Sequence, residues 1–305
     1  MPSSLGSFIR SLLSLGLPPE LSPDRIALTM KYLEAEFSVL EFQRLSEQPV
    51  FIFSAGWRSG STLLQRLIVS SGKILVWGEP FGDRLPVPRL AESLGVVVNE
   101  DSHIRLHERL LASGLFKCDT GLANEWIANL NPGASQLALS QLAFLETLFA
   151  APAQQKGYTR WGCKFVRLSG QHARYLKWLY PNCKVIFLVR HPYKAWLSYK
   201  GKGWYSVFPT HRVVHPWSFF SFWEGLASSF QAFEGEKLVV RYEDLIDPGT
   251  RNQELRRIGS FVDESLDSSI LEQKVGGTAK RIPPRAWERT MMDFLTRSRQ
   301  RFGYD

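Results

Sequence analysis

The 305-residue sequence predicts an α/β protein in which a parallel β-sheet is flanked by helices. Short β-rich runs alternate with helical segments along most of the chain, and this alternation requires crossover connections between parallel strands. The content of 44% hydrophobic and 13% aromatic residues suffices for a substantial buried core. We therefore expect one α/β domain at residues 49–305, preceded by a helical N-terminal extension at residues 1–48.

The order of the predicted elements is a repeated strand, loop and helix. The β-rich runs are residues 49–53, 73–77, 162–166, 184–189 and 237–241. Helical periodicity occurs at residues 62–69, 135–149, 170–179, 193–199 and 218–233, and C-terminal helices with charged faces are expected at 251–257 and 285–305. Residues 81–126 and 201–217 fit this scheme poorly, and we expect them to be insertions over the sheet that shape a ligand pocket.

Composition and charge indicate which kind of ligand and which location to expect for the protein. Lys and Arg outnumber Asp and Glu by 37 to 29, and the net charge of +8 favours a polyanionic ligand, for which a nucleotide suffices without any nucleic-acid partner. The three cysteines are odd in number and widely spaced, which favours neither a disulfide framework nor a zinc cluster and agrees with a cytoplasmic location. The most apolar stretch, residues 137–153, contains Ser140, Gln141 and Glu146, so we expect no transmembrane segment. The oligomeric state cannot be read from the sequence.

A loop rich in glycine and serine, residues 55–62, follows the first predicted strand and precedes the first predicted helix. A Walker-type phosphate loop needs glycine-rich backbone whose amides hold phosphate, and a lysine for the β- and γ-phosphates. Here Ser61 stands where that lysine is expected, Ala55 replaces the first glycine, and Arg58 lies on the loop itself. This pattern favours an anion at a helix N-terminus that carries less charge than a magnesium triphosphate, although a plain turn before a helix would look similar.

A second motif joins a strand end to the next helix. Arg190 stands at the carboxyl end of the strand predicted at 184–189, and Ser198 lies about two turns into the following helix. The two side chains are expected to converge on one phosphate, the guanidinium as a bidentate donor and the hydroxyl beside it. Alone, these residues would also fit a surface ion pair and an ordinary helix position. Their order after the loop favours the phosphate site.

The two motifs resemble the sulfotransferase superfamily, whose phosphosulfate loop typically reads Arg or Lys, Ser, Gly, Ser or Thr, Thr, as residues 58–62 do. The resemblance spans residues 50–281 and implies a P-loop-type fold. It also implies 3′-phosphoadenosine 5′-phosphosulfate (PAPS) as sulfuryl donor, 3′,5′-adenosine bisphosphate as product and no metal. The residues that it assigns to the 5′-phosphate are Arg58, Ser59, Gly60, Ser61 and Thr62, and those that it assigns to the 3′-phosphate are Arg190 and Ser198.

Two weaker elements extend the resemblance. Residues 237–245 resemble the strand and Tyr-Glu-Asp-Leu run of these enzymes, and Tyr242 would approach the adenine or else pack as a core tyrosine. Residues 276–281 occupy the place of a C-terminal basic loop over the nucleotide, where Lys280 or Arg281 would complete the 3′-phosphate site. Their spacing departs from the Arg-Lys-Gly form of the cytosolic enzymes.

Sulfuryl transfer needs a base for the acceptor's proton and a cation for the leaving phosphate oxygen. Glu79 comes directly after the strand predicted at 73–77 and its Gly78, at the edge of the sheet where ligands bind. It resembles the Gly-Glu element of tyrosylprotein and bacterial carbohydrate sulfotransferases, so we expect it to be the base. Lys164 matches a lysine that touches the transferring group in relatives, and we expect it and Arg58 to stabilise the transition state. A turn glutamate and a solvent-facing strand lysine are the alternatives.

Several assignments stay open at this stage. His191, His211 and His215 would line an acceptor pocket or be hydrogen-bonded loop residues. The predicted reaction is sulfuryl transfer from PAPS to a hydroxyl of a small-molecule, glycan or lipid-like acceptor. The alternatives are a P-loop kinase or NTPase, which would ordinarily need the lysine absent at position 61, and a non-catalytic nucleotide-binding protein of the same fold.

Overall fold

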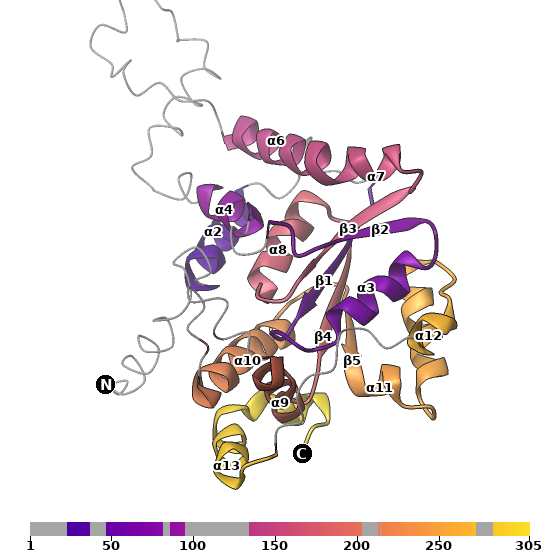
Figure 1. The fold of residues 1–305 in the computed structure, drawn as a ribbon. Helices are drawn as coiled ribbons and strands as arrows, with labels where there is room; N and C mark the ends of the chain where they lie inside the picture. The colour runs from indigo at the N-terminus through magenta and orange to yellow at the C-terminus, as the bar shows by residue number, and fades with distance from the viewer. Residues whose placement is uncertain are drawn as a thin grey trace, which may run out of the picture.

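The computed structural model describes residues 23–36, 47–81, 86–94, 134–202, 213, 215–272 and 283–305. Within this part of the chain five parallel strands form one sheet in the order β2-β3-β1-β4-β5. The strands are β1 (Val50–Ser54), β2 (Ile74–Gly78), β3 (Arg160–Phe165), β4 (Lys184–Val189) and β5 (Leu238–Arg241). The predicted α/β class with a parallel sheet between helices is therefore confirmed (Figure 1).

Helices cover both faces of the sheet because the strand residues are apolar on both sides. Phe51 and Phe53 of β1 belong to one hydrophobic cluster, whereas Val50 and Ile52 of the same strand belong to a second. The second cluster contains α3 (Ser61–Val69) and α12 (Arg251–Val262), and Figure 1 shows both helices on one side of the sheet. The first cluster contains residues of α2 (Pro23–Glu36), α4 (Pro86–Ser93), α6 (Ala134–Leu145), α8 (Gly170–Leu179) and α10 (Pro216–Gln231).

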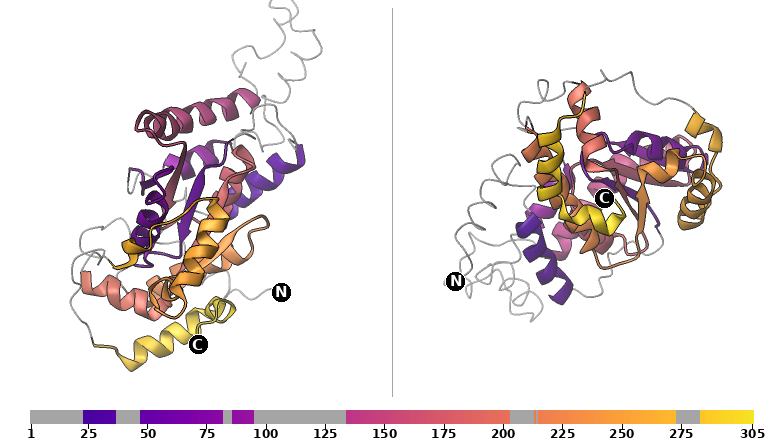
Figure 2. Two further views of the ribbon diagram at one scale, coloured as in Figure 1. Left: turned by 90° about the vertical axis from the view of Figure 1, so that its right-hand side faces the viewer. Right: turned by 90° about the horizontal axis from the view of Figure 1, so that it is seen from below.

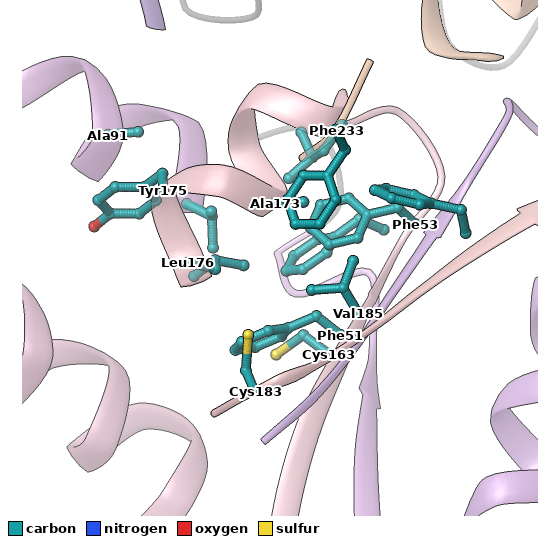
Figure 3. Packing of buried hydrophobic residues seen from close by; sticks show 14 of the residues in the cluster. Phe51, Phe53, Ala91, Cys163, Ala173, Tyr175, Leu176, Cys183, Val185 and Phe233 are labelled. Atoms are coloured by element: carbon teal, nitrogen blue, oxygen red, sulfur yellow. The ribbon is translucent and has the colours of Figure 1, made fainter. Parts of the chain in front are cut away.

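The first cluster is the larger core, and Figure 3 shows part of it from close by. Phe51, Phe53 and Val185 of the sheet pack there with Ala173 and Leu176 of α8, and all five side chains are buried. The remaining connecting elements are η6 (Glu146–Ala150), α7 (Ala151–Gln155), α9 (Pro192–Lys202), α11 (Tyr242–Ile246), η8 (Ser268–Glu272), α13 (Ala286–Leu295) and η9 (Arg297–Phe302). Two perpendicular views place α6 and α13 at opposite ends of the molecule (Figures 1 and 2).

Helix α2, from the predicted N-terminal extension, packs against α8. Ile26, Met30 and Leu33 are buried in the same core as the sheet, and Glu34 forms an ion pair with Arg174 of α8. Residues 23–36 form a helix, and the helical N-terminal extension as a unit stays a prediction. The division of the chain at residue 49 stays a prediction.

Most predicted elements differ from the observed ones by one to three residues at their ends. The main differences lie in the longer helical segments. The helix predicted at 135–149 continues through the π-helical turn η6 into α7, and the helix predicted at 251–257 continues to Val262 because Ile258 and Val262 are buried. The C-terminal helices were expected to carry solvated charges, but Glu288 and Arg299 are buried and bonded, which corrects that expectation.

Other sequence-based expectations concern absences, and they apply to the described residues alone. There, no helix is long and apolar enough to cross a membrane. Likewise, no group of His, Cys, Asp and Glu in that part of the chain has the arrangement of a metal site. Cys163 and Cys183 are buried free thiols, and Cys118 lies outside the described residues.

The first turn of α8 contains a buried histidine that makes stability depend on pH. The Nδ1 atom of His172 accepts a hydrogen bond from the backbone N–H of Ser169 at 3.1 Å, which fixes the start of the helix. Burial lowers the pKa of His172 to about 3, from an ordinary value of 6.5. Between these two values the unfolded chain binds the proton more readily, so acidification through this window destabilises the fold.

We expect His172→Gln to reduce this acid sensitivity. Glutamine is the usual third helical residue of a capping box, so it keeps the bond to Ser169 without the titrating ring. Between pH 7 and pH 5 the wild type should lose about 2 kcal/mol more unfolding free energy than the variant. Urea unfolding at both pH values checks this, and equal losses in the two proteins would show that folding does not lower the pKa of His172.

Candidate active site

The loop at residues 55–62 lies at the carboxyl edge of the sheet, between β1 and α3. Gly56 and Gly60 have φ values of 84° and 92°, which few other residues adopt, and Gly60 is the N-cap of α3. Ser59 fixes the turn, because its hydroxyl donates to the carbonyl oxygen of Gly56 at 2.5 Å. The loop therefore delivers the chain to the N-terminus of α3 in one defined conformation.

The backbone amides at this helix N-terminus are available to a ligand. Among the contacts within the described part of the chain, the N–H groups of Ser59, Gly60, Ser61 and Thr62 donate no hydrogen bond to a protein acceptor. No side chain caps α3, so the first amides keep the orientation in which helices bind anions. The loop and the first turn of α3 thus have the geometry of an anion cradle, and phosphate binding there stays a prediction.

Three residues from the two predicted motifs meet beside the loop. The Nε of Arg58 donates to the Ser198 hydroxyl at 3.0 Å, and one terminal nitrogen of Arg190 donates to the Arg58 carbonyl at 2.7 Å. The Nε of Arg190 is buried and has no hydrogen-bond partner in the protein. Burial, followed by the positive charge of Arg190, lowers the pKa of Arg58. A buried unsatisfied donor and two neighbouring cations fit a bound anion.

Tyr242 packs against this cluster from the end of β5. Its ring faces the Arg190 guanidinium at 4.5 Å, and a Cβ placed on Gly60 would lie 2.1 Å from its Cδ2 atom. Tyr242 thus forms a wall of the loop, and its predicted approach to an adenine stays a prediction.

Glu79 and Lys164 form an ion pair on the other side of the loop. The Lys164 Nζ lies 3.0 Å from Glu79 Oε1, and the Glu79 backbone N–H donates to the Lys164 carbonyl at 3.0 Å. Neighbouring strands cause this pairing, because β2 and β3 are adjacent and Gly78 is in register with Lys164. The Lys164 side chain is 6% exposed and that of Glu79 is 36% exposed, so the carboxylate is the member of the pair that solvent reaches.

Two of the four non-glycine residues with positive φ in the described part of the chain belong to this site, and the other two are Phe81 and Asp263. Arg58 and Glu79 have φ values of 63° and 34°, in the left-handed region that side chains other than glycine rarely adopt. Strained residues persist where the surrounding structure holds them, and they cluster at functional sites. Both strained residues here are ones that sequence reasoning assigned to chemistry.

The remaining sequence candidates have other positions. The Nδ1 of His191 accepts from the backbone N–H of Tyr193, and its ring contacts Tyr304. His215 is the N-cap of α10. His211, Lys280 and Arg281 lie outside the described residues, so the predicted roles of Lys280 and Arg281 stay predictions.

Sequence reasoning missed two supporting contacts. Arg167, two residues after β3, is 5% exposed, and its guanidinium lies 5.9 Å from the ring centroid of Trp57 on the loop. The Glu243 carboxylate accepts from the backbone N–H of His191 and from the Tyr304 hydroxyl, which ties α11 to the end of β4. The position of Arg167 beyond a strand end was a signal for the first contact, and the Tyr-Glu-Asp-Leu run was a signal for the second.

The fold and the site define an α/β protein of the P-loop type with a paired carboxylate and lysine at the carboxyl edge of its sheet. Residues 49–268 match the model of the sulfotransferase family, so the chain belongs to that family. No match is found among curated protein sequences.

Solved structures that resemble the chain include other sulfotransferases. The sulfotransferase domain of the Synechococcus PCC 7002 olefin synthase is 19% identical with a TM-score of 0.43, over 87% of this chain and 99% of that one. The sulfotransferase domain of the curacin biosynthetic pathway is 20% identical with a TM-score of 0.43, over 76% and 81%. Sulfotransferase STF9 from Mycobacterium avium is 16% identical with a TM-score of 0.37, over 80% and 70%.

Proposed function

We propose that this chain is a PAPS-dependent sulfotransferase that sulfates a hydroxyl of a small-molecule or carbohydrate-type acceptor, with Glu79 as general base. The observation that carries the proposal is the buried Nε of Arg190, which lacks a protein partner beside the loop. This donor fits a second phosphate group next to the one at α3. PAPS has phosphates at both its 3′ and 5′ positions, and it supplies the sulfuryl group when bound.

The two phosphates have separate protein partners. The backbone amides of residues 59–62 hold the 5′-phosphate at the N-terminus of α3, and Arg58 adds a charge from the loop. Arg190 and Ser198 hold the 3′-phosphate, and the bond from Arg58 to Ser198 joins the two halves. This arrangement explains why Ser61 replaces the lysine of a Walker loop, because no γ-phosphate needs to be held.

The chemistry needs one proton acceptor and one cation at the reacting centre. Glu79 takes the proton of the acceptor hydroxyl, since its carboxylate is the exposed member of the pair. Lys164 has three N–H donors, so it keeps its bond to Glu79 while it stabilises the charge that develops on the leaving phosphate oxygen. No part of this scheme calls on a metal ion.

Nucleotide binding tests the proposal against an ATP-dependent enzyme of the same fold. Isothermal titration calorimetry should show 3′,5′-adenosine bisphosphate binding at least about 10-fold more tightly than ATP with magnesium, because only the bisphosphate engages both sites. It should also bind about 10- to 100-fold more tightly than adenosine 5′-monophosphate, which lacks the 3′-phosphate. Tighter binding of ATP with magnesium would favour a kinase or NTPase.

The Arg190→Gln variant tests whether Arg190 is the residue that binds the 3′-phosphate. The advantage of the bisphosphate over adenosine 5′-monophosphate should shrink to a few-fold in the variant. Arg174→Gln is the control, because it removes an arginine that pairs with Glu34 on the helical layer. If the variant weakens both nucleotides equally, Arg190 supports the loop through the Arg58 carbonyl and does not hold the 3′-phosphate.

A further inference from the structure

Three large apolar side chains are exposed on α10 and α13. Trp287 and Phe294 of α13 are 50% and 71% exposed, and Trp217 of α10 is 40% exposed. Trp287 and Phe294 are about two helical turns apart, so they lie on the same side of α13. Another side of this helix is buried through Glu288 and Met292. The fold thus leaves one apolar side of α13 uncovered.

Helices α10 and α13 lie side by side and run in the same direction. Met292 of α13 belongs to the same hydrophobic cluster as Phe219, near the start of α10. Beyond α13, the backbone N–H of Ser298 donates to the Glu224 carboxylate, further along α10. The first turns of the two helices are therefore at the same end of the pair, and each contains an exposed tryptophan. We call the three exposed side chains the aromatic patch: Trp217, Trp287 and Phe294.

The charges around the aromatic patch are mainly positive. The exposed arginines on and beside α13 are Arg285, Arg289, Arg297 and Arg301. The two acidic residues of α13 are already paired, Glu288 with Lys200 and Asp293 with Arg299. Within the described part of the chain, no carboxylate forms an ion pair with the exposed arginines. A surface of this kind is complementary to one that is anionic and partly apolar.

Helix α13 belongs to the end of the molecule that contains the candidate active site. Met292 is in one hydrophobic cluster with Trp57, from the loop between β1 and α3, and with Val166, the residue after β3. The backbone N–H of Arg285 also donates to the hydroxyl of Tyr193, near the start of α9. Figures 1 and 2 show α13 at the surface there, at the end opposite α6. The aromatic patch is therefore outside the layer that covers the carboxyl edge of the sheet.

We propose that the aromatic patch and the surrounding arginines bind the surface of a bilayer that contains anionic lipids. Exposed tryptophan and phenylalanine with arginines around them are typical of helices that lie in the bilayer interface, where the rings enter the headgroup region and the arginines meet the lipid phosphates. A second copy of the chain fits less well, because the same arginines would meet across a symmetric interface and repel one another. The inference goes beyond the proposed sulfotransferase function and does not depend on it. Binding of this kind brings the candidate active site next to the bilayer.

Vesicle binding tests the inference. Large unilamellar vesicles of phosphatidylcholine with about 30% phosphatidylglycerol are compared with vesicles of phosphatidylcholine alone, in a flotation assay at about 0.1 M salt. The protein should partition at least about 10-fold more strongly to the anionic vesicles, and about 0.5 M salt should remove most of this difference because it screens the arginines. Absence of binding to both kinds of vesicle, or equal binding to both, would overturn the inference.

Substitutions in the aromatic patch distinguish it from a general attraction of the basic protein. Trp287→Ser combined with Phe294→Ser should weaken partition to the anionic vesicles at least about 10-fold, because both rings are lost from the interface. Leu139→Ser combined with Phe144→Ser is the matched control, since these side chains of α6 are 40% and 41% exposed at the opposite end of the molecule. The control should bind as the wild type does. No loss in the first variant, or an equal loss in the control, would show that another surface meets the vesicle, and the inference would fail.

Arg285→Gln combined with Arg297→Gln tests the charge. Arg289 is retained because its guanidinium packs over the Tyr193 ring at 5.5 Å. The variant should lose about 10-fold in partition to the anionic vesicles, and its binding to phosphatidylcholine alone should be unchanged. Unchanged binding to the anionic vesicles would overturn the inference, because the anionic lipid would then be bound elsewhere.

Two solution measurements separate the other outcomes. Calorimetry with 3′,5′-adenosine bisphosphate should give the same affinity in every variant, which shows that each is folded. A protein that binds the bisphosphate but no vesicle leaves the proposed function standing and overturns the inference, whereas the reverse result overturns the proposed function alone. In sedimentation velocity, a wild-type dimer that the Trp287→Ser and Phe294→Ser variant loses would also overturn the inference, because a second copy would then cover the aromatic patch.

Discussion

Replacement of Glu79 by glutamine is expected to lower the kcat of sulfuryl transfer about 100- to 10,000-fold. The amide keeps the size of the side chain but accepts no proton from the acceptor hydroxyl. Affinity for 3′,5′-adenosine bisphosphate should stay within about 3-fold, because no phosphate contact involves this residue. Steady-state rates with saturating PAPS, together with calorimetry on the bisphosphate, check both halves of the prediction.

A matched control separates the loss of a base from the loss of an ion pair. Glu34 pairs with Arg174, and its side chain is 36% exposed, as that of Glu79 is. Glu34→Gln should therefore cost no more than the exposed pair itself, about 1 kcal/mol of stability or less, and leave kcat unchanged. If the Glu79→Gln enzyme turns over at the wild-type rate, Glu79 is not the general base. Its ion pair with Lys164 then has a structural role only.

The sequence predicted the layout of this site well, because strand ends of a parallel sheet converge at one edge. The strand Lys184–Val189 and the helix Gly170–Leu179 were predicted with their observed bounds, since both have dense apolar patterns between clear breaks. The loop and the Arg190 position follow from these elements. The order of strand, loop and helix thus placed the residues that are proposed to bind the phosphates at one edge of the sheet.

The contacts between the side chains could not be predicted from the sequence. The pairing of Glu79 with Lys164 depends on β2 lying next to β3, and strand order is set by packing of the whole domain. Arg167 was not singled out in the sequence, and its position over Trp57 is a tertiary contact. Burial of Glu288 and Arg299 likewise depends on how α13 and η9 pack against the rest of the chain. These are non-local contacts, which local patterns do not encode.

Gly60 is the second position where a small substitution should have a large effect, because one added methyl group should strongly weaken nucleotide binding. Its φ is 92°, and a Cβ added there would lie 2.1 Å from the Tyr242 ring, which leaves no room for alanine. Either Tyr242 moves away from Arg190 or the N-terminus of α3 shifts, and both changes disturb the anion cradle. We expect Gly60→Ala to weaken binding of 3′,5′-adenosine bisphosphate by on the order of 100-fold, since several charge-assisted hydrogen bonds share this geometry. Calorimetry with the bisphosphate measures the loss.

Gly157→Ala is the control that separates the effect of the clash with Tyr242 from the effect of a positive φ on the Gly60→Ala variant. Its φ of 85° is close to that of Gly60, but nothing lies within 4 Å of an added Cβ, and the residue stands between α7 and β3. Gly157→Ala should therefore have only the cost of a left-handed alanine, about 1–2 kcal/mol, with nucleotide affinity unchanged. Gly60→Ala combined with Tyr242→Ala should regain part of the lost affinity, because the smaller side chain removes the clash. If the double variant binds no better than Gly60→Ala, the φ preference of the loop and not the contact with Tyr242 requires glycine, and the cradle is a property of the backbone alone.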